Sequence, residues 1–218
     1  MTRPVTARSP HHVRPAAHRP DTEGLYVEAP TYYRPQRNDP PAVFLAGGIV
    51  GITERWHSRV VAALQAARTP VVVLNPNRAE FPIDNPSAAW EQVSWEQHHL
   101  HLAGLTAFWF AASDPAVTTQ PIAMFELGQA LGEGRPVVVG ASPDYPREPD
   151  VHMLCQLAKP GLPVFSDLDD MVAQIQKYVA DTGSRRSRPR RGEPVLDSAD
   201  GGQVEQGDRG HPDHFRVL

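Results

Sequence analysis

One glutamate stands out in residues 121–131, PIAMFELGQAL, which otherwise read as an apolar helix. Pro121 suits the first helical position, and Ile122, Glu126 and Ala130 then follow at a spacing of four, so they share one face. The helix dipole does not explain the acid, because that effect fades within the first turn. A buried carboxylate is costly unless it is paired, protonated or functional. We therefore expect Glu126 either to accept hydrogen bonds from a nearby glycine loop or to take part in chemistry.

That glycine loop lies in residues 45–56, LAGGIVGITERW, directly after an apolar run. It matches neither GxGxxG nor GxxxxGK[ST], and Arg55 is the one basic residue near its glycines. We expect a tight strand–helix turn in which a ligand approaches the backbone of Gly47 and Gly48. Phosphate binding at this loop is the less favoured alternative.

A second polar segment, residues 75–86 (NPNRAEFPIDNP), is too long and too rich in polar groups for a minimal connection. Asn75, Asn77 and Arg78 offer hydrogen-bond donors suited to a nucleobase or a sugar, and Phe81 could stack on a base. The alternative is that the asparagines only shape the loop through Asx turns.

Other reactive side chains do not form a recognised set. His98 and His101 stand three residues apart on a predicted helix but lack partner ligands, so we expect no metal site and no cofactor. Cys155 has apolar neighbours in HMLCQLA and is predicted to be a packed thiol rather than a nucleophile.

The composition is that of an ordinary globular protein. The 218 residues are 40% apolar with a formal net charge of −4, which gives no general reason to expect nucleic acid or a membrane surface as a partner. No apolar run approaches the roughly 20 residues of a membrane span. A single cysteine excludes an intrachain disulfide, so we expect a reducing, cytoplasmic location.

The two ends of the chain differ from its middle. Residues 1–41 hold eight of the 23 prolines and almost no periodic apolar pattern, which predicts a flexible N-terminal arm, with EGLYVEAPTYY as a candidate for lying on the surface of the body. Residues 183–218 predict a disordered C-terminal tail with five arginines between 184 and 192. The domain itself is predicted to cover 42–182.

Within the domain, strand and helix patterns alternate. The predicted strands cover 42–47, 70–76, 105–110, 135–141 and 162–166, and the predicted helices cover 53–67, 87–104, 121–131 and 167–181. Such alternation predicts an α/β, flavodoxin-like doubly wound sandwich with a parallel sheet of about five strands. Ligands of such sheets bind at the carboxyl ends of the strands, where the strand order reverses. Glu126 would face that place.

Four stretches, in order, resemble the nucleoside 2-deoxyribosyltransferase-like family. They are VFLAGGI, LNPNRAEFP, WEQVSWEQHHLHLAG with FWF, and PIAMFELGQALGEGRPVVV, and they span roughly 43–139. The resemblance implies that Glu126 is a nucleophile that attacks C1′ of a (deoxy)ribonucleoside and forms a glycosyl-enzyme ester. A nucleobase then accepts the sugar in transferases, and water accepts it in hydrolases. The resemblance also implies a homo-oligomer.

Two positions depart from the family pattern. Gly104 stands where relatives carry an aspartate that helps to handle the nucleobase, and Gln120, with Asp114 as a substitute, stands where an acid is common before the catalytic helix. Gly48 replaces a serine typical of hydrolases that act on 5′-phosphates, which favours an unphosphorylated substrate. The alternative to an enzyme is a catalytically weakened nucleoside- or nucleotide-binding module of the same fold, and Gly104 is the feature that favours it.

Overall fold

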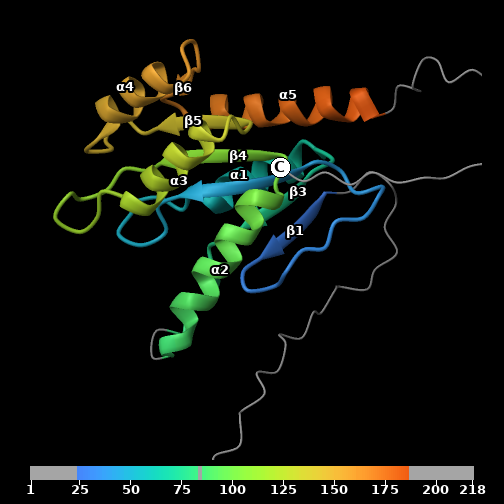
Figure 1. Cartoon of the computed structure of the whole chain (residues 1–218), viewed down its shortest axis with the longest axis horizontal. Coiled ribbons are helices and arrows are strands. Elements are labelled where there is room, and N and C mark those ends of the chain that lie inside the picture. Colours follow the sequence, from blue (N-terminus) through green and yellow to red (C-terminus); the bar gives the residue numbers. More distant parts are fainter. Residues whose placement is uncertain (1–23, 83–84, 187–218) are drawn as a thin grey trace, which may run out of the picture. The chain divides into compact units, whose positions relative to one another are not determined.

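A computed structural model describes residues 24–82 and 85–186, and within them six strands form one parallel sheet (Figure 1). The strands are β1 (Leu25–Glu28), β2 (Ala42–Gly47), β3 (Val72–Asn75), β4 (Leu105–Phe110), β5 (Val137–Ala141) and β6 (Val164–Phe165). Their order across the sheet is β1-β3-β2-β4-β5-β6, and every neighbouring pair is parallel. Without β1, the order is that of a flavodoxin-like sheet, which confirms the predicted fold class.

Helices cover both faces of this sheet. They are α1 (Trp56–Ala66), α2 (Pro86–Leu102), α3 (Pro121–Gly132), α4 (Glu148–Ala158) and α5 (Leu168–Arg186). Buried side chains of α2, α3 and α4 pack on one face around Phe44, Phe108 and Phe110. Those of α1 and α5 pack on the other face around Leu45 and Trp109. The four central strands, β2 to β5, are buried on both sides, which explains why they read as continuous apolar runs.

The sequence patterns locate most of these elements to within a few residues. Helix α4 was not predicted, and its two fully buried residues, Val151 and Cys155, form too narrow an apolar stripe to mark a helix. Burial of Cys155 agrees with the predicted packed thiol and raises its pKa to about 11. Helix α2 begins one residue before the predicted start at 87, because Asn85 is its N-cap and accepts the Ser87 N–H.

Part of the predicted N-terminal arm belongs to the sheet. Strand β1 pairs with β3, and the segment after it is attached to α2 by two hydrogen bonds. The Trp95 indole N–H donates to the Thr31 carbonyl oxygen at 2.8 Å, and the Tyr33 N–H donates to His99 Nε2 at 3.1 Å. A four-residue strand whose partner lies 47 positions away leaves no local pattern, so the boundary at residue 41 was drawn too late.

At the other end, α5 continues to Arg186, four residues past the predicted boundary at 182. The remainder of the predicted arm and tail, residues 1–23 and 187–218, lies outside the described residues. Across 24–82 and 85–186, every helix is too short or too polar to cross a lipid bilayer.

Candidate active site

A cavity of about 250 Å³ opens where the strand order reverses, at the carboxyl ends of β2, β3 and β4. The loops that follow β2 and β4 lie at the same end of the sheet (Figure 1), joined by a bridge between Ile52 and Ser113. This is where ligands bind in doubly wound sheets. The cavity is lined by residues 44–50, Pro76, Glu96, residues 118–123 and Glu126, with gaps at 45 and 119. A larger hollow of about 730 Å³ lies beside β1 and α1, and none of its lining residues is acidic.

The glycine loop forms one end of the cavity and is held on both sides. A side chain at Gly47 would meet the Trp109 carbonyl oxygen at 2.2 Å, so the close approach of β4 requires glycine there. The Gly48 carbonyl oxygen accepts the Trp56 indole N–H at 3.0 Å, and the Gly48 N–H donates to Gln120 Oε1 at 3.0 Å. The loop is therefore fixed before any ligand arrives.

Gln120 reaches the Gly48 N–H from a residue with a left-handed backbone conformation. It precedes α3 with φ of +52°, a left-handed conformation that residues other than glycine seldom adopt. Its side chain is buried, and its Nε2 donates to the Ala111 carbonyl oxygen at 2.6 Å and to Ser113 Oγ at 3.3 Å. All of the polar groups of the amide thus have partners from the loops after β2 and β4.

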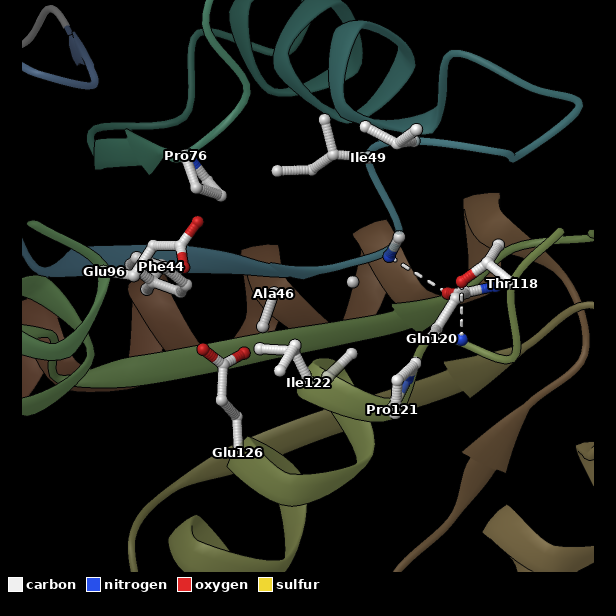
Figure 2. Close-up of a pocket in the computed structure, with 14 residues that line it drawn as sticks. Phe44, Ala46, Ile49, Pro76, Glu96, Thr118, Gln120, Pro121, Ile122 and Glu126 are labelled. Carbon is white, nitrogen blue, oxygen red and sulfur yellow. Dashed lines mark hydrogen bonds between the residues drawn. The ribbon is translucent and has the colours of Figure 1, made fainter. Parts of the chain in front are cut away.

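Glu126 lies on the second turn of α3 and points into the cavity (Figure 2). Only 6% of the surface of Glu126 is exposed. Burial, and secondly the negative charge of Glu96, raise the pKa of Glu126 to about 8. The sequence also allowed Glu126 to accept hydrogen bonds from the glycine loop. In the structure the Gly48 N–H donates to Gln120 instead.

Glu96, on α2, is the acid that the sequence analysis did not assign to the site. It lines the same cavity as Glu126, and burial raises its pKa. Its Oε1 accepts a hydrogen bond from Gln92 Nε2 at 2.8 Å, and the same nitrogen donates to the Pro76 carbonyl oxygen at 2.7 Å. Gln92 and Glu96 are four residues apart, on a helix that also carries the buried Trp95. That spacing is the feature of the sequence that could have indicated that Glu96 lies near the site.

Figure 2 places these groups at two ends of the cavity. Glu126 and Glu96 lie at one end with Phe44, while Gln120 and Thr118 lie at the other end beside the glycine loop. Burial and the negative charge of Glu96 make ionisation of Glu126 costly, so Glu126 keeps its proton at pH 7 in the resting site. Such a pair can supply one nucleophile and one acid.

The polar loop after β3 does not reach this cavity, apart from Pro76. Asn75 is buried, donates to the Tyr26 hydroxyl at 2.8 Å and accepts the Asn77 N–H at 3.0 Å, which is the Asx turn considered as the alternative. Arg78 pairs with Glu91 and lies over the Phe81 ring at 5.7 Å. Its side chain is only 5% exposed, so it is not placed to offer its donors to a nucleobase or a sugar.

Asp114 is likewise outside the cavity lining. It is exposed, and its Oδ1 accepts the Ala116 N–H at 2.8 Å in the loop after β4. Of the nine residues predicted for the site, the fold brings four to the cavity, namely Gly47, Gly48, Gln120 and Glu126.

Gly104 lies at the wrong end of the sheet to handle a nucleobase. It immediately precedes β4, where its N–H donates to the Ala42 carbonyl oxygen and its carbonyl oxygen accepts the Tyr178 hydroxyl. The six residues of β4 separate it from the cavity by about 20 Å. A glycine at this position therefore does not affect the groups that would protonate the leaving base. Gly104 gives no reason to regard the site as catalytically weakened.

Comparison with known families gives one match. Residues 40–145 match a family described as nucleoside 2-deoxyribosyltransferase like. Over these residues the chain is similar to that family. Every residue that lines the cavity falls within the matched segment. No curated protein matches the chain.

Proposed function

We propose that the protein cleaves or transfers the N-glycosidic bond of a (deoxy)ribonucleoside, with Glu126 as the nucleophile. The observation that carries the proposal is a buried carboxylate that shares a cavity with a second acid, Glu96, in a segment similar to the nucleoside 2-deoxyribosyltransferase-like family. A cavity of about 250 Å³ is slightly smaller than the usual range for ligand sites, roughly 300–1,000 Å³.

The reaction would proceed in two displacements. An ionised Glu126 oxygen bonds to C1′ while the C1′–N bond breaks, and the leaving base takes a proton from Glu96. A second nucleobase, or water, then attacks C1′ and releases the Glu126 carboxylate, returning a proton to Glu96. The reactive state therefore has Glu126 ionised and Glu96 protonated, so the proton that Glu126 holds at rest must first move to Glu96, whose Oε1 accepts the hydrogen bond from Gln92.

The test is a panel of ribo- and 2′-deoxyribonucleosides, incubated with and without a second free base and analysed by chromatography. Glu126→Gln keeps the side-chain shape and should lower turnover by about a thousandfold or more. The matched control is Glu133→Gln, at the exposed end of the same helix, which should keep activity. Full activity of Glu126→Gln would refute the proposal.

A 2-fluoro-substituted deoxynucleoside should trap the intermediate, because fluorine destabilises the oxocarbenium-like transition state of the second step. Intact-protein mass spectrometry should then show one added sugar on the peptide that contains Glu126. An adduct on another residue would overturn the assignment. An inactive wild type that still binds nucleosides would favour the binding module instead.

We also propose that the protein is a homo-oligomer. The adjacent helices α3 and α4 expose five large apolar side chains: Ile122, Phe125, Met153, Leu154 and Leu157. Exposed apolar groups gathered on neighbouring helices often mark protein interfaces. Light scattering should give a multiple of 24.0 kDa, and the double variant Phe125→Glu with Leu157→Glu should reduce the mass to that of one chain.

A further inference from the structure

The two glutamates of the cavity differ in the hydrogen bonds that they receive. Glu96 Oε1 accepts a hydrogen bond from Gln92 Nε2 at 2.8 Å. Within residues 24–82 and 85–186, no group donates a hydrogen bond to the Glu126 carboxyl. Burial raises the pKa of both acids, and at Glu96 the hydrogen bond from Gln92 opposes that rise, because a donated hydrogen bond stabilises the carboxylate. Glu96 is therefore the acid that ionises more readily.

The Gln92 amide is held in the orientation that this hydrogen bond needs. Its Nε2 also donates to the Pro76 carbonyl oxygen at 2.7 Å, directly after β3. Exchanging the amide nitrogen and oxygen would place Oε1 against two acceptors, which excludes the opposite orientation. Gln92 Oε1 is buried without a partner among the described residues, an arrangement that costs stability. The amide is thus placed by the two hydrogen bonds of its nitrogen.

Besides the two glutamates, the cavity lining contains no ionisable side chain within the described part of the chain. On α2 itself, His99 Nε2 accepts the Tyr33 N–H, and burial lowers the pKa of His99 to about 4, so it is neutral at pH 7. Glu91, on the same helix, pairs with Arg78. The charge of the two glutamates therefore depends on burial, on their mutual repulsion and on Gln92.

We propose that Gln92 is a positioning residue that keeps Glu96 ionised, and so leaves the proton of the pair on Glu126, until a nucleobase binds. The inference rests on the proposed function, which places the base beside Glu96. A base atom that accepts a hydrogen bond from Glu96 favours the protonated form of that acid.

The proton then leaves an oxygen of Glu126 and joins Oε2 of Glu96, the oxygen that Gln92 does not occupy. Glu126 becomes the carboxylate that bonds to C1′. The two acids lie at the same end of the cavity (Figure 2), and the pair carries one negative charge before and after the transfer. Binding of the base thereby activates the nucleophile, and Gln92 keeps it inactive without the base.

The experiment follows both carboxyl groups by NMR during a pH titration of the full chain, labelled with ¹³C at Cδ of glutamate. Glu96→Gln and Glu126→Gln assign the two signals. In wild type, Glu96 should titrate at a lower pH than Glu126. Gln92→Met keeps the length of the side chain without a donor, so the titration midpoint of Glu96 should rise by about 1–2 pH units, the worth of a hydrogen bond to a charged group.

The matched control is Gln97→Met, on the same helix. The Gln97 side chain has no hydrogen bond among the described residues, so both midpoints should stay unchanged. A kinetic measurement separates positioning from packing: Gln92→Met should move the rising limb of kcat/KM to higher pH, because Glu96 then loses its proton later. A loss of packing alone would lower the rate equally at every pH.

Thermal denaturation checks that the variants fold, and Gln92→Leu replaces Gln92→Met if that variant does not. Titration of Glu126 below Glu96 in wild type, or an unmoved Glu96 midpoint in a folded Gln92 variant, overturns the inference and leaves the proposed function standing. If no nucleoside is cleaved, the proposed function fails, while the NMR titration, which needs no turnover, still decides where the proton resides.

Discussion

Glu96 and Glu126 enter one cavity from two different helices, and the charge of Glu96 adds to burial in raising the pKa of Glu126. Helix α2 supplies the first acid and α3 the second, with Phe44 of β2 lining the cavity beside them (Figure 2). Among the described residues that line the cavity there is no lysine, arginine or histidine, so no positive side chain there offsets the negative charge of the two glutamates. This relationship gives the site a pH dependence and a cost in stability, both of which can be measured.

The first prediction concerns the pH–rate profile. The reactive state has Glu126 ionised and Glu96 protonated, so kcat/KM should rise with pH as the pair loses its first proton and fall again above about 8, where the pair loses its last. Glu96→Gln leaves Glu126 as the one acid of the pair, so its slow residual activity should keep the rising limb and lose the fall above about pH 8. Steady-state rates of both proteins across pH 5–9 test this, and a fall that persists in Glu96→Gln would contradict it.

The second prediction concerns the leaving group. If Glu96 protonates the departing base, Glu96→Gln should slow an ordinary nucleoside by about a hundredfold or more. An N7-methylated purine nucleoside carries its positive charge already, so its base leaves without that proton and should be slowed much less. Equal slowing of the two substrates would show that Glu96 acts in some other way.

The third prediction concerns stability. The folded-state pKa of Glu126 is raised from 4.5 to about 8, so the folded protein retains a proton that the unfolded chain releases. This contribution is fully present below about pH 4.5 and is lost as pH rises through about 8. Glu126→Gln should therefore raise the free energy of unfolding by about 1–4 kcal/mol at pH 9, with a gain that vanishes in acid. Denaturant titrations at both pH values measure it, with the exposed Glu133→Gln as the control that shows no such gain.

The fourth prediction separates two neighbours in the loop after β3. Arg78 is nearly buried between Glu91 and Phe81, so Arg78→Ala should cost about 1–2 kcal/mol of stability. Asn77→Ala should stay within about 0.5 kcal/mol of wild type, because only its backbone N–H has a hydrogen bond given by the structure. Thermal melts of both variants, with nucleoside binding measured in parallel, would show whether this loop is structural.

The fifth prediction concerns the N-terminal boundary. A chain that starts at residue 24 keeps β1, the hydrogen bond from Trp95 to Thr31 and the hydrogen bond from Tyr33 to His99, and it should melt close to the full-length protein. A chain that starts at residue 42 loses them all and leaves β3 with an open edge, so its melting temperature should fall markedly. Equal melting temperatures of the two truncated proteins would contradict this prediction and show that the stable domain begins after residue 41.

The sequence by itself predicted the fold class and four residues that the structure places at the cavity, namely Gly47, Gly48, Gln120 and Glu126. Continuous apolar strands that alternate with helices predict a parallel sheet covered on both faces, and the position of the site follows from where such sheets reverse their order. Glu126 was identifiable because an acid on the apolar face of a helix breaks a local pattern, which is readable without contacts.

Only the tertiary structure decided which other residues share the cavity with Glu126. Glu96 and Gln120 lie on different elements at opposite ends of the cavity, and their places depend on the packing of α2 and on the left-handed backbone before α3. Asn75 and Arg78 are of types that suit a ligand, yet they bond to Tyr26 and Glu91 of the protein itself. Gly104 was interpreted as a departure at the site because of its place in the sequence, yet it lies a strand's length from the cavity. Residue type and spacing specify what a side chain can do, whereas its partners are set by contacts between segments far apart in the chain.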